Sequence, residues 1–115
     1  MAKELVLDDL FAKMLDAARK SLQSSLKSKW PKVRDLTASS IRDIAQNMVD
    51  IRSLLASGAI TREQASLKFS LQRNAFRTLL LTEKGISLVV AEDAVNSALK
   101  AVKDTVNKAL GFAFI

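Results

Sequence analysis

The chain has 115 residues, of which 49% are hydrophobic and 26% charged, and its formal net charge is +6. This balance predicts a single folded domain over residues 1–115 and excludes an intrinsically disordered chain. The sequence contains no Cys and no His, which excludes disulfides, thiolate or imidazole catalysis, and the common ligand sets for zinc, haem and iron–sulfur clusters.

Apolar residues recur at helical spacing in four segments, which predicts helices near residues 7–29, 31–57, 62–84 and 87–110. The first helix is expected to break at Trp30-Pro31, because Pro is tolerated in a first helical turn while the residue before it avoids helical angles. The second is expected to end at Ser57-Gly58, where Gly provides a left-handed C-cap.

The clearest local signal lies at the start of the third helix. Thr61 and Gln64 stand three residues apart, which is the spacing of a capping box. Gly85 and Gly111 are expected to end the third and fourth helices. Comparable helix lengths and short connections favour antiparallel neighbours, so the sequence predicts an all-α, up-down-up-down four-helix bundle.

The third helix has an unusually wide apolar arc. Its main stripe consists of Ala65, Phe69, Phe76, Leu79 and Leu80. A second stripe of Leu67, Leu71 and Ala75 lies well away from the first. Such a helix is either central to its domain or packed against a partner. Two interpretations therefore stay open for the second stripe, namely packing under the second and fourth helices or contact with another molecule.

The fourth helix is expected to bury a stripe that begins at Leu88, and the chain then ends in the apolar tail of residues 112–115. Because exposing Phe112, Phe114 and Ile115 would forgo several kcal/mol of burial, at roughly 1.5 to 3 kcal/mol per side chain, we expect the tail to be docked. It either packs on its own bundle, near the Gly58 connection and the start of the first helix, or packs in trans against the second stripe.

Positive charge concentrates in residues 19–34, which hold six basic residues and no acidic one, next to the only Trp. The candidate phosphate-contacting residues are Lys27, Lys29, Lys32 and Arg34, together with Arg73 and Arg77 on the third helix. Trp30 could act as a stacking surface for bases. The alternatives are contact with anionic lipid and a solvated basic surface without a ligand.

No catalytic residue, metal ligand or cofactor site is predicted. The serine pairs at residues 24–25 and 39–40 have no evident base, Glu92 and Asp93 do not face each other on a helix, and no Gly lies in a phosphate-cradling motif. Residues 1–9 lack the pattern of a signal peptide, and no apolar run approaches the roughly 20 residues that span a bilayer, so we expect a cytoplasmic protein without a membrane span.

The sequence thus favours a small non-enzymatic helical bundle that acts through protein–protein contacts, with self-association as the expected mode. Its candidate interaction surface consists of Leu67, Leu71, Ala75, Phe112, Phe114 and Ile115. The alternative is a weak, non-specific nucleic-acid-binding module that uses the basic stretch 19–34. A third interpretation is a bundle that holds a small apolar ligand between its helices.

Overall fold

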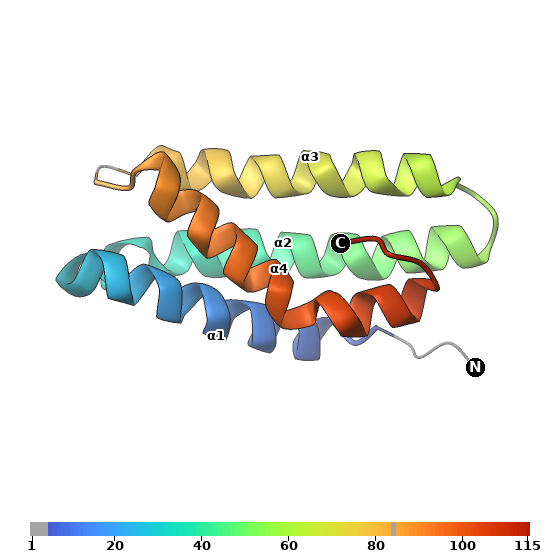
Figure 1. Cartoon of the computed structure of the whole chain (residues 1–115), viewed down its shortest axis with the longest axis horizontal. Helices are drawn as coiled ribbons and strands as arrows, with labels where there is room; N and C mark the ends of the chain where they lie inside the picture. The colour runs from blue at the N-terminus through green and yellow to red at the C-terminus, as the bar shows by residue number, and fades with distance from the viewer. Residues whose placement is uncertain (1–4, 84) are drawn as a thin grey trace.

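In the part of the chain that the structure describes, four α-helices run alternately up and down along the long axis of a 45 × 22 × 20 Å body (Figure 1). The computed structural model describes residues 5–83 and 85–115, and all the regular structure in these ranges is helical. The helices are α1 (Leu7–Leu26), α2 (Trp30–Ala56), α3 (Arg62–Leu81) and α4 (Leu88–Leu110). The predicted all-α, up-down-up-down bundle is confirmed.

The corner between α1 and α2 differs from the prediction. Helix α1 ends at Leu26, three residues early, because Lys27 adopts a positive φ of 54° and a 3₁₀ turn, Lys27–Lys29, follows it. The expectation that Trp30 avoids helical angles is wrong, since its φ and ψ are −52° and −45°. Pro31 occupies the first turn of α2, where its missing N–H leaves no hydrogen bond unmade.

The predicted capping box is confirmed at the start of α3. The Gln64 backbone N–H donates to Thr61 Oγ1 at 3.1 Å, and the Thr61 N–H donates to Gln64 Oε1 at 2.9 Å. The helix ends at Leu81, slightly before the predicted end, and Lys84 lies outside the described residues. Helix α4 begins at Leu88 after Ser87, whose Oγ accepts from the Val90 N–H.

The four helices share one core, but α3 is the least enclosed. Helix α1 packs mainly against α4 and α2, and α2 packs against α3, whereas α3 and α4 share a smaller contact. Figure 1 shows the reason: α4 starts beside the end of α3 and then crosses away from it toward α1. The largest fully buried side chains include Met14, Leu22, Ile41, Ile44, Met48, Phe76, Leu80 and Val102.

Two residues assigned to the core from sequence lie elsewhere. Leu88 is 54% exposed, because it is the first residue of α4 and stands at the end of the bundle. Leu79 is also exposed, on the edge of the main stripe of α3. Across residues 5–83 and 85–115, no helix combines the length and the hydropathy needed to cross a membrane.

Candidate interaction surfaces

The side of α3 that faces away from the core carries two exposed leucines. Leu67 and Leu71 are 62% and 63% exposed, whereas Phe69 and Phe76 on the opposite side are buried. Ala75, the third member of the predicted second stripe, is exposed as well. Neither α2 nor α4 buries this stripe, so the chain itself leaves this face open.

The same face is uncharged along most of the helix. Leu67, Leu71, Asn74, Ala75 and Thr78, here called the outer strip, lie on the side of α3 away from the core, and the exposed Lys68 stands at its edge near Ala75. All residues of the strip are exposed and none is ionisable. The twelve residues from Leu67 to Thr78 extend about 18 Å, and a solvated helix face of that length ordinarily carries charged residues.

The C-terminal tail is docked on its own chain. Phe114 is only 9% exposed, and its ring lies against that of Phe69 on α3, with 4.8 Å between the ring centroids. Asn107 on α4 holds the tail backbone, because its Oδ1 accepts from the N–H groups of Phe114 and Ile115, both at 2.9 Å. The tail therefore occupies the space that opens where α4 diverges from α3 (Figure 1).

The tail's position agrees in part with the intramolecular alternative. The Arg62 guanidinium, at the start of α3 just after the Gly58 connection, lies 4.6 Å from the centroid of the Phe112 ring. The contacts that hold the tail come from α3 and α4. Because Phe69 is on the core side of α3, the tail and the outer strip lie on opposite sides of this helix. The six predicted interaction residues are thus two separate groups.

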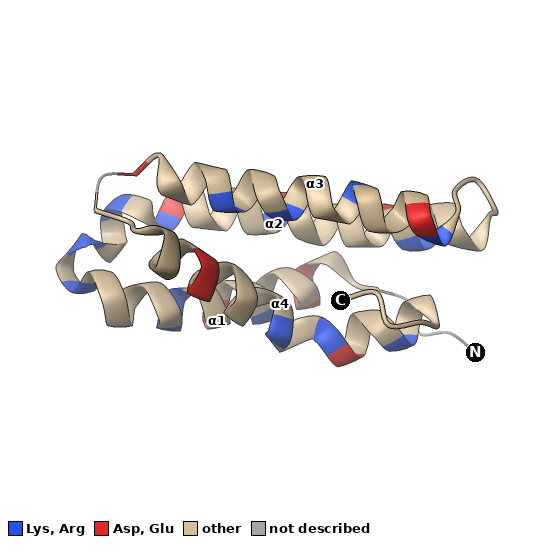
Figure 2. Ribbon diagram, turned by 45° about the horizontal axis from the view of Figure 1, so that its top comes forward, with Lys and Arg blue, Asp and Glu red and all other residues tan. Residues whose placement is uncertain are grey.

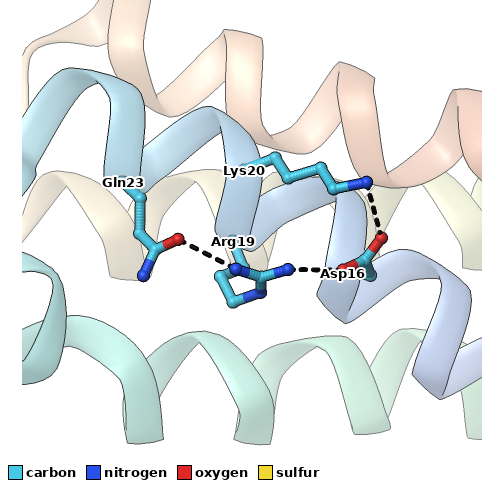
Figure 3. Close-up of polar contacts among 4 residues, drawn as sticks. All are labelled: Asp16, Arg19, Lys20 and Gln23. Carbon is cyan, nitrogen blue, oxygen red and sulfur yellow. Dashed lines mark hydrogen bonds and ion pairs between the residues drawn. The ribbon is translucent and has the colours of Figure 1, made fainter.

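The basic stretch is also divided. On α1, Arg19 Nη2 lies 2.7 Å from Asp16 Oδ1, and Lys20 Nζ lies 3.1 Å from Asp16 Oδ2 (Figure 3). Arg19 Nη1 further donates to Gln23 Oε1 at 2.9 Å. The hydrogen bond from Arg19, followed by that from Lys20, lowers the pKa of the Asp16 carboxyl. This pair of cations is already neutralised in part by its own helix.

The remaining basic residues of the stretch gather at the corner between α1 and α2. Figure 2 shows Lys and Arg positions in blue along the connection between α1 and α2. We call Lys27, Lys29, Lys32 and Arg34 the basic corner, and all four are exposed. Within the described part of the chain, the only ion pair they form is a loose one of 3.7 Å between Arg34 Nε and Asp35 Oδ1. Trp30 is 6% exposed and packs into the core, so the hypothesis that it offers a stacking surface is wrong.

Arg73 and Arg77 do not join the basic corner. They line a small hollow of about 60 Å³ between α3 and α4, which Glu92 and Asn96 also line. Arg77 Nη1 lies 3.3 Å from Glu92 Oε1. The acidic partner of Arg77 thus lies on α4. The six candidate phosphate-contacting residues form two clusters, one at the α1–α2 corner and one between α3 and α4.

A partly enclosed hollow beside apolar residues lies at the other end of the bundle. It measures about 300 Å³ and lies between the end of α2, the start of α3 and the end of α4, beside Phe112. Arg52 and Arg62 stand at its wall. In residues 5–83 and 85–115, no group of three or more acidic side chains is placed to hold a metal ion.

Sequence reasoning missed the exposed pair Leu88 and Val89, which are 54% and 69% exposed at the start of α4. A signal for them existed, because Leu88, Val89 and Val90 are consecutive, and three consecutive residues of a helix cannot all face one core.

Comparison of the chain with protein-family models, with curated protein sequences and with solved structures finds no match.

Proposed function

We propose that the protein is a non-enzymatic helical bundle that self-associates through the outer strip of α3. The observation that carries the proposal is the exposure of Leu67 and Leu71 in the middle of an uncharged helix face. Interface centres are depleted of charged residues, and those of homodimers are more apolar than the rest of the surface.

The position of the charges is compatible with a second copy as the partner. Two copies of a chain with a net charge of +6 repel each other, and this repulsion is weakest where they meet at a face without cations. The outer strip is such a face, with Lys68 beside it and Arg77 at the far flank, where Glu92 pairs with it. A two-fold axis across the strip places the leucines of both copies together.

The size of the strip predicts a weak dimer. Four leucines, at roughly 1.5 to 3 kcal/mol each on full burial, give a gain of the same order as the estimated 4 to 15 kcal/mol cost of association. We therefore expect association that depends on concentration in the micromolar range or above.

Sedimentation equilibrium over about 1 to 100 μM tests the proposal. The wild-type chain should shift from monomer mass toward dimer mass, and the double variant Leu67→Gln, Leu71→Gln should stay monomeric. Gln keeps the helix propensity close to that of Leu. The matched control is Leu88→Gln, Val89→Gln, which removes a similar exposed apolar pair at the bundle end. A monomeric wild-type chain, or equal loss of dimer in both variants, would contradict the proposal.

A further inference from the structure

One end of the bundle combines free positive charge with exposed apolar side chains. The basic corner lies where α1 turns into α2, and Leu88 and Val89 lie where the α3–α4 connection enters α4 (Figures 1 and 2). Neither feature belongs to the outer strip, so a ligand bound at this end is independent of the proposed self-association.

The two features are close in space. A Cβ built on Gly85 would lie 3.2 Å from Lys29 Nζ, so the tip of Lys29 reaches across to the α3–α4 connection. Leu88 follows Gly85 by three residues, which limits the distance between their Cα atoms to about 11 Å. Lys27 and Lys32 are two and three residues from Lys29 in the chain. The basic corner and the apolar pair therefore lie at one end of the bundle, where Lys29 links them, and we call the two together the footprint.

We propose that this end of the bundle binds the surface of a bilayer that contains anionic lipid. In this arrangement the basic corner meets the headgroups, and Leu88 and Val89 enter the boundary between headgroups and acyl chains. Peripheral proteins bind membranes through this combination, because electrostatic attraction and buried apolar area add to each other.

The footprint fits lipid better than nucleic acid. Binding to phosphates alone would leave Leu88 and Val89 in water, whereas binding to a bilayer removes both side chains from water. A nucleic-acid surface would gain from an exposed aromatic ring, but Trp30 is buried. The acidic residues at this end are Glu83 and Asp35, with Glu92 and Asp93 one turn beyond Leu88 and Val89 on α4. Glu92 pairs with Arg77, and Asp35 pairs only loosely with Arg34. Positive charge therefore prevails over the corner.

Co-sedimentation with vesicles tests the proposal. The full chain should bind vesicles of phosphatidylcholine mixed with phosphatidylserine, should bind less as the salt concentration rises, and should not bind phosphatidylcholine alone. Equal binding to both kinds of vesicle, or no binding to either at low salt, would overturn the proposal.

Two double variants separate the contributions. Lys27→Glu, Lys32→Glu should lower the partition onto the mixed vesicles at least about 25-fold, since each basic residue contributes about fivefold. The control Lys100→Glu, Lys103→Glu makes the same change in net charge on exposed positions of α4 and should retain most of the binding. Leu88→Gln, Val89→Gln should lower the partition by about tenfold or more. Circular dichroism establishes that each variant is folded.

Nucleic acid is the competing outcome. Labelled duplex DNA and single strands are titrated under the same salt conditions with wild type and with Leu88→Gln, Val89→Gln. Binding to nucleic acid that survives this substitution, together with absent vesicle binding, would assign the corner to nucleic acid and overturn the proposal. The variant Leu67→Gln, Leu71→Gln should bind vesicles like the wild type, which keeps this test independent of self-association.

Discussion

The rings of Phe69 on α3 and Phe114 in the C-terminal tail lie 4.8 Å apart between centroids and are inclined by 55°. This tilted contact joins the second turn of α3 to the last residues of the chain across the space that α4 leaves. Phe112 adds an edge contact to Phe114 at 5.9 Å. Near its start, α3 thus packs against the tail, whereas near its end it packs against α4 (Figure 1).

Removal of the tail should destabilise the fold without changing the oligomeric state. Deletion of residues 112–115, or Phe114→Ala alone, is expected to lower the free energy of unfolding by about 3 to 5 kcal/mol, because the buried Phe114 ring is lost and the space against Phe69 is left unfilled. Ala113→Ser is the matched control on an exposed tail residue and should change it by less than about 0.5 kcal/mol. Urea unfolding and sedimentation measure both properties. Loss of dimer from a stable truncated chain would show that the tail acts in trans.

Asn107 should act as the anchor of the tail backbone. Asn107→Ala removes the acceptor of two N–H groups in partly buried surroundings, at an expected cost of about 1 to 3 kcal/mol. Hydrogen exchange at the amides of Phe114 and Ile115 should accelerate by about tenfold or more. Asn96→Ala, at an exposed position of α4, is the control. Unchanged exchange at both amides would show that ring packing alone fixes the tail.

The helices could be predicted from sequence because apolar periodicity and caps are local properties. Thr61 and Gln64 are three residues apart, and their hydrogen bonds depend on nothing outside that turn. The corner at Lys27 could not be predicted in the same way, because its positive φ arises where two helices pack and the chain must reverse between them. Pro31 indicated that a break lies nearby, but the predicted end of the first helix, residue 29, is three residues after its observed end at Leu26.

The candidate surfaces were only partly predictable for a related reason. Periodicity identifies Leu67 and Leu71 as lying off the main stripe, but whether α4 covers them depends on the direction in which α4 crosses the bundle. The division of the basic residues has the same origin. Asp16 lies within one turn of Arg19 and was visible in the sequence, whereas the partner of Arg77 is Glu92, on another helix.

Two core positions should be among the most sensitive in the chain. Ile44 and Phe76 are almost completely buried, so Ile44→Ala or Phe76→Ala is expected to cost about 2 to 5 kcal/mol through lost transfer energy and the cavity left behind. Leu71→Ala, which shortens an exposed leucine, should cost less than about 0.5 kcal/mol in the monomer. Denaturant midpoints compare the three. A midpoint unchanged by Ile44→Ala would place that residue outside the core.

The capping box should contribute a measurable share of stability. Thr61→Ala removes the side-chain acceptor for the Gln64 N–H and is expected to cost about 1 kcal/mol. Thr78→Ala, in the middle of α3 and exposed, serves as the control and should be neutral or slightly stabilising, because Ala has the higher helix propensity. Thermal unfolding of both variants measures the difference. Equal melting temperatures for the two variants would contradict a role for the cap.

Protonation of the Asp16 carboxylate at acid pH should lower the stability of the fold. Its hydrogen bonds with Arg19 and Lys20 hold its pKa in the folded protein below the ordinary value of 3.8 (Figure 3). A lowered folded-state pKa stabilises the protein above the unfolded-state pKa, and this contribution is lost as the pH falls through the folded-state pKa. The melting temperature of Asp16→Asn should therefore be below that of wild type at neutral pH, and the two should begin to converge as the pH falls below about 3.8. Asp104→Asn is the control, because no ion pair to Asp104 forms among the described residues. The difference is expected to be small, since the Asp16 side chain is exposed, and added salt should reduce it further. A difference between wild type and Asp16→Asn that is the same at pH 7 and at pH 3 would show that the carboxylate acts through something other than its charge.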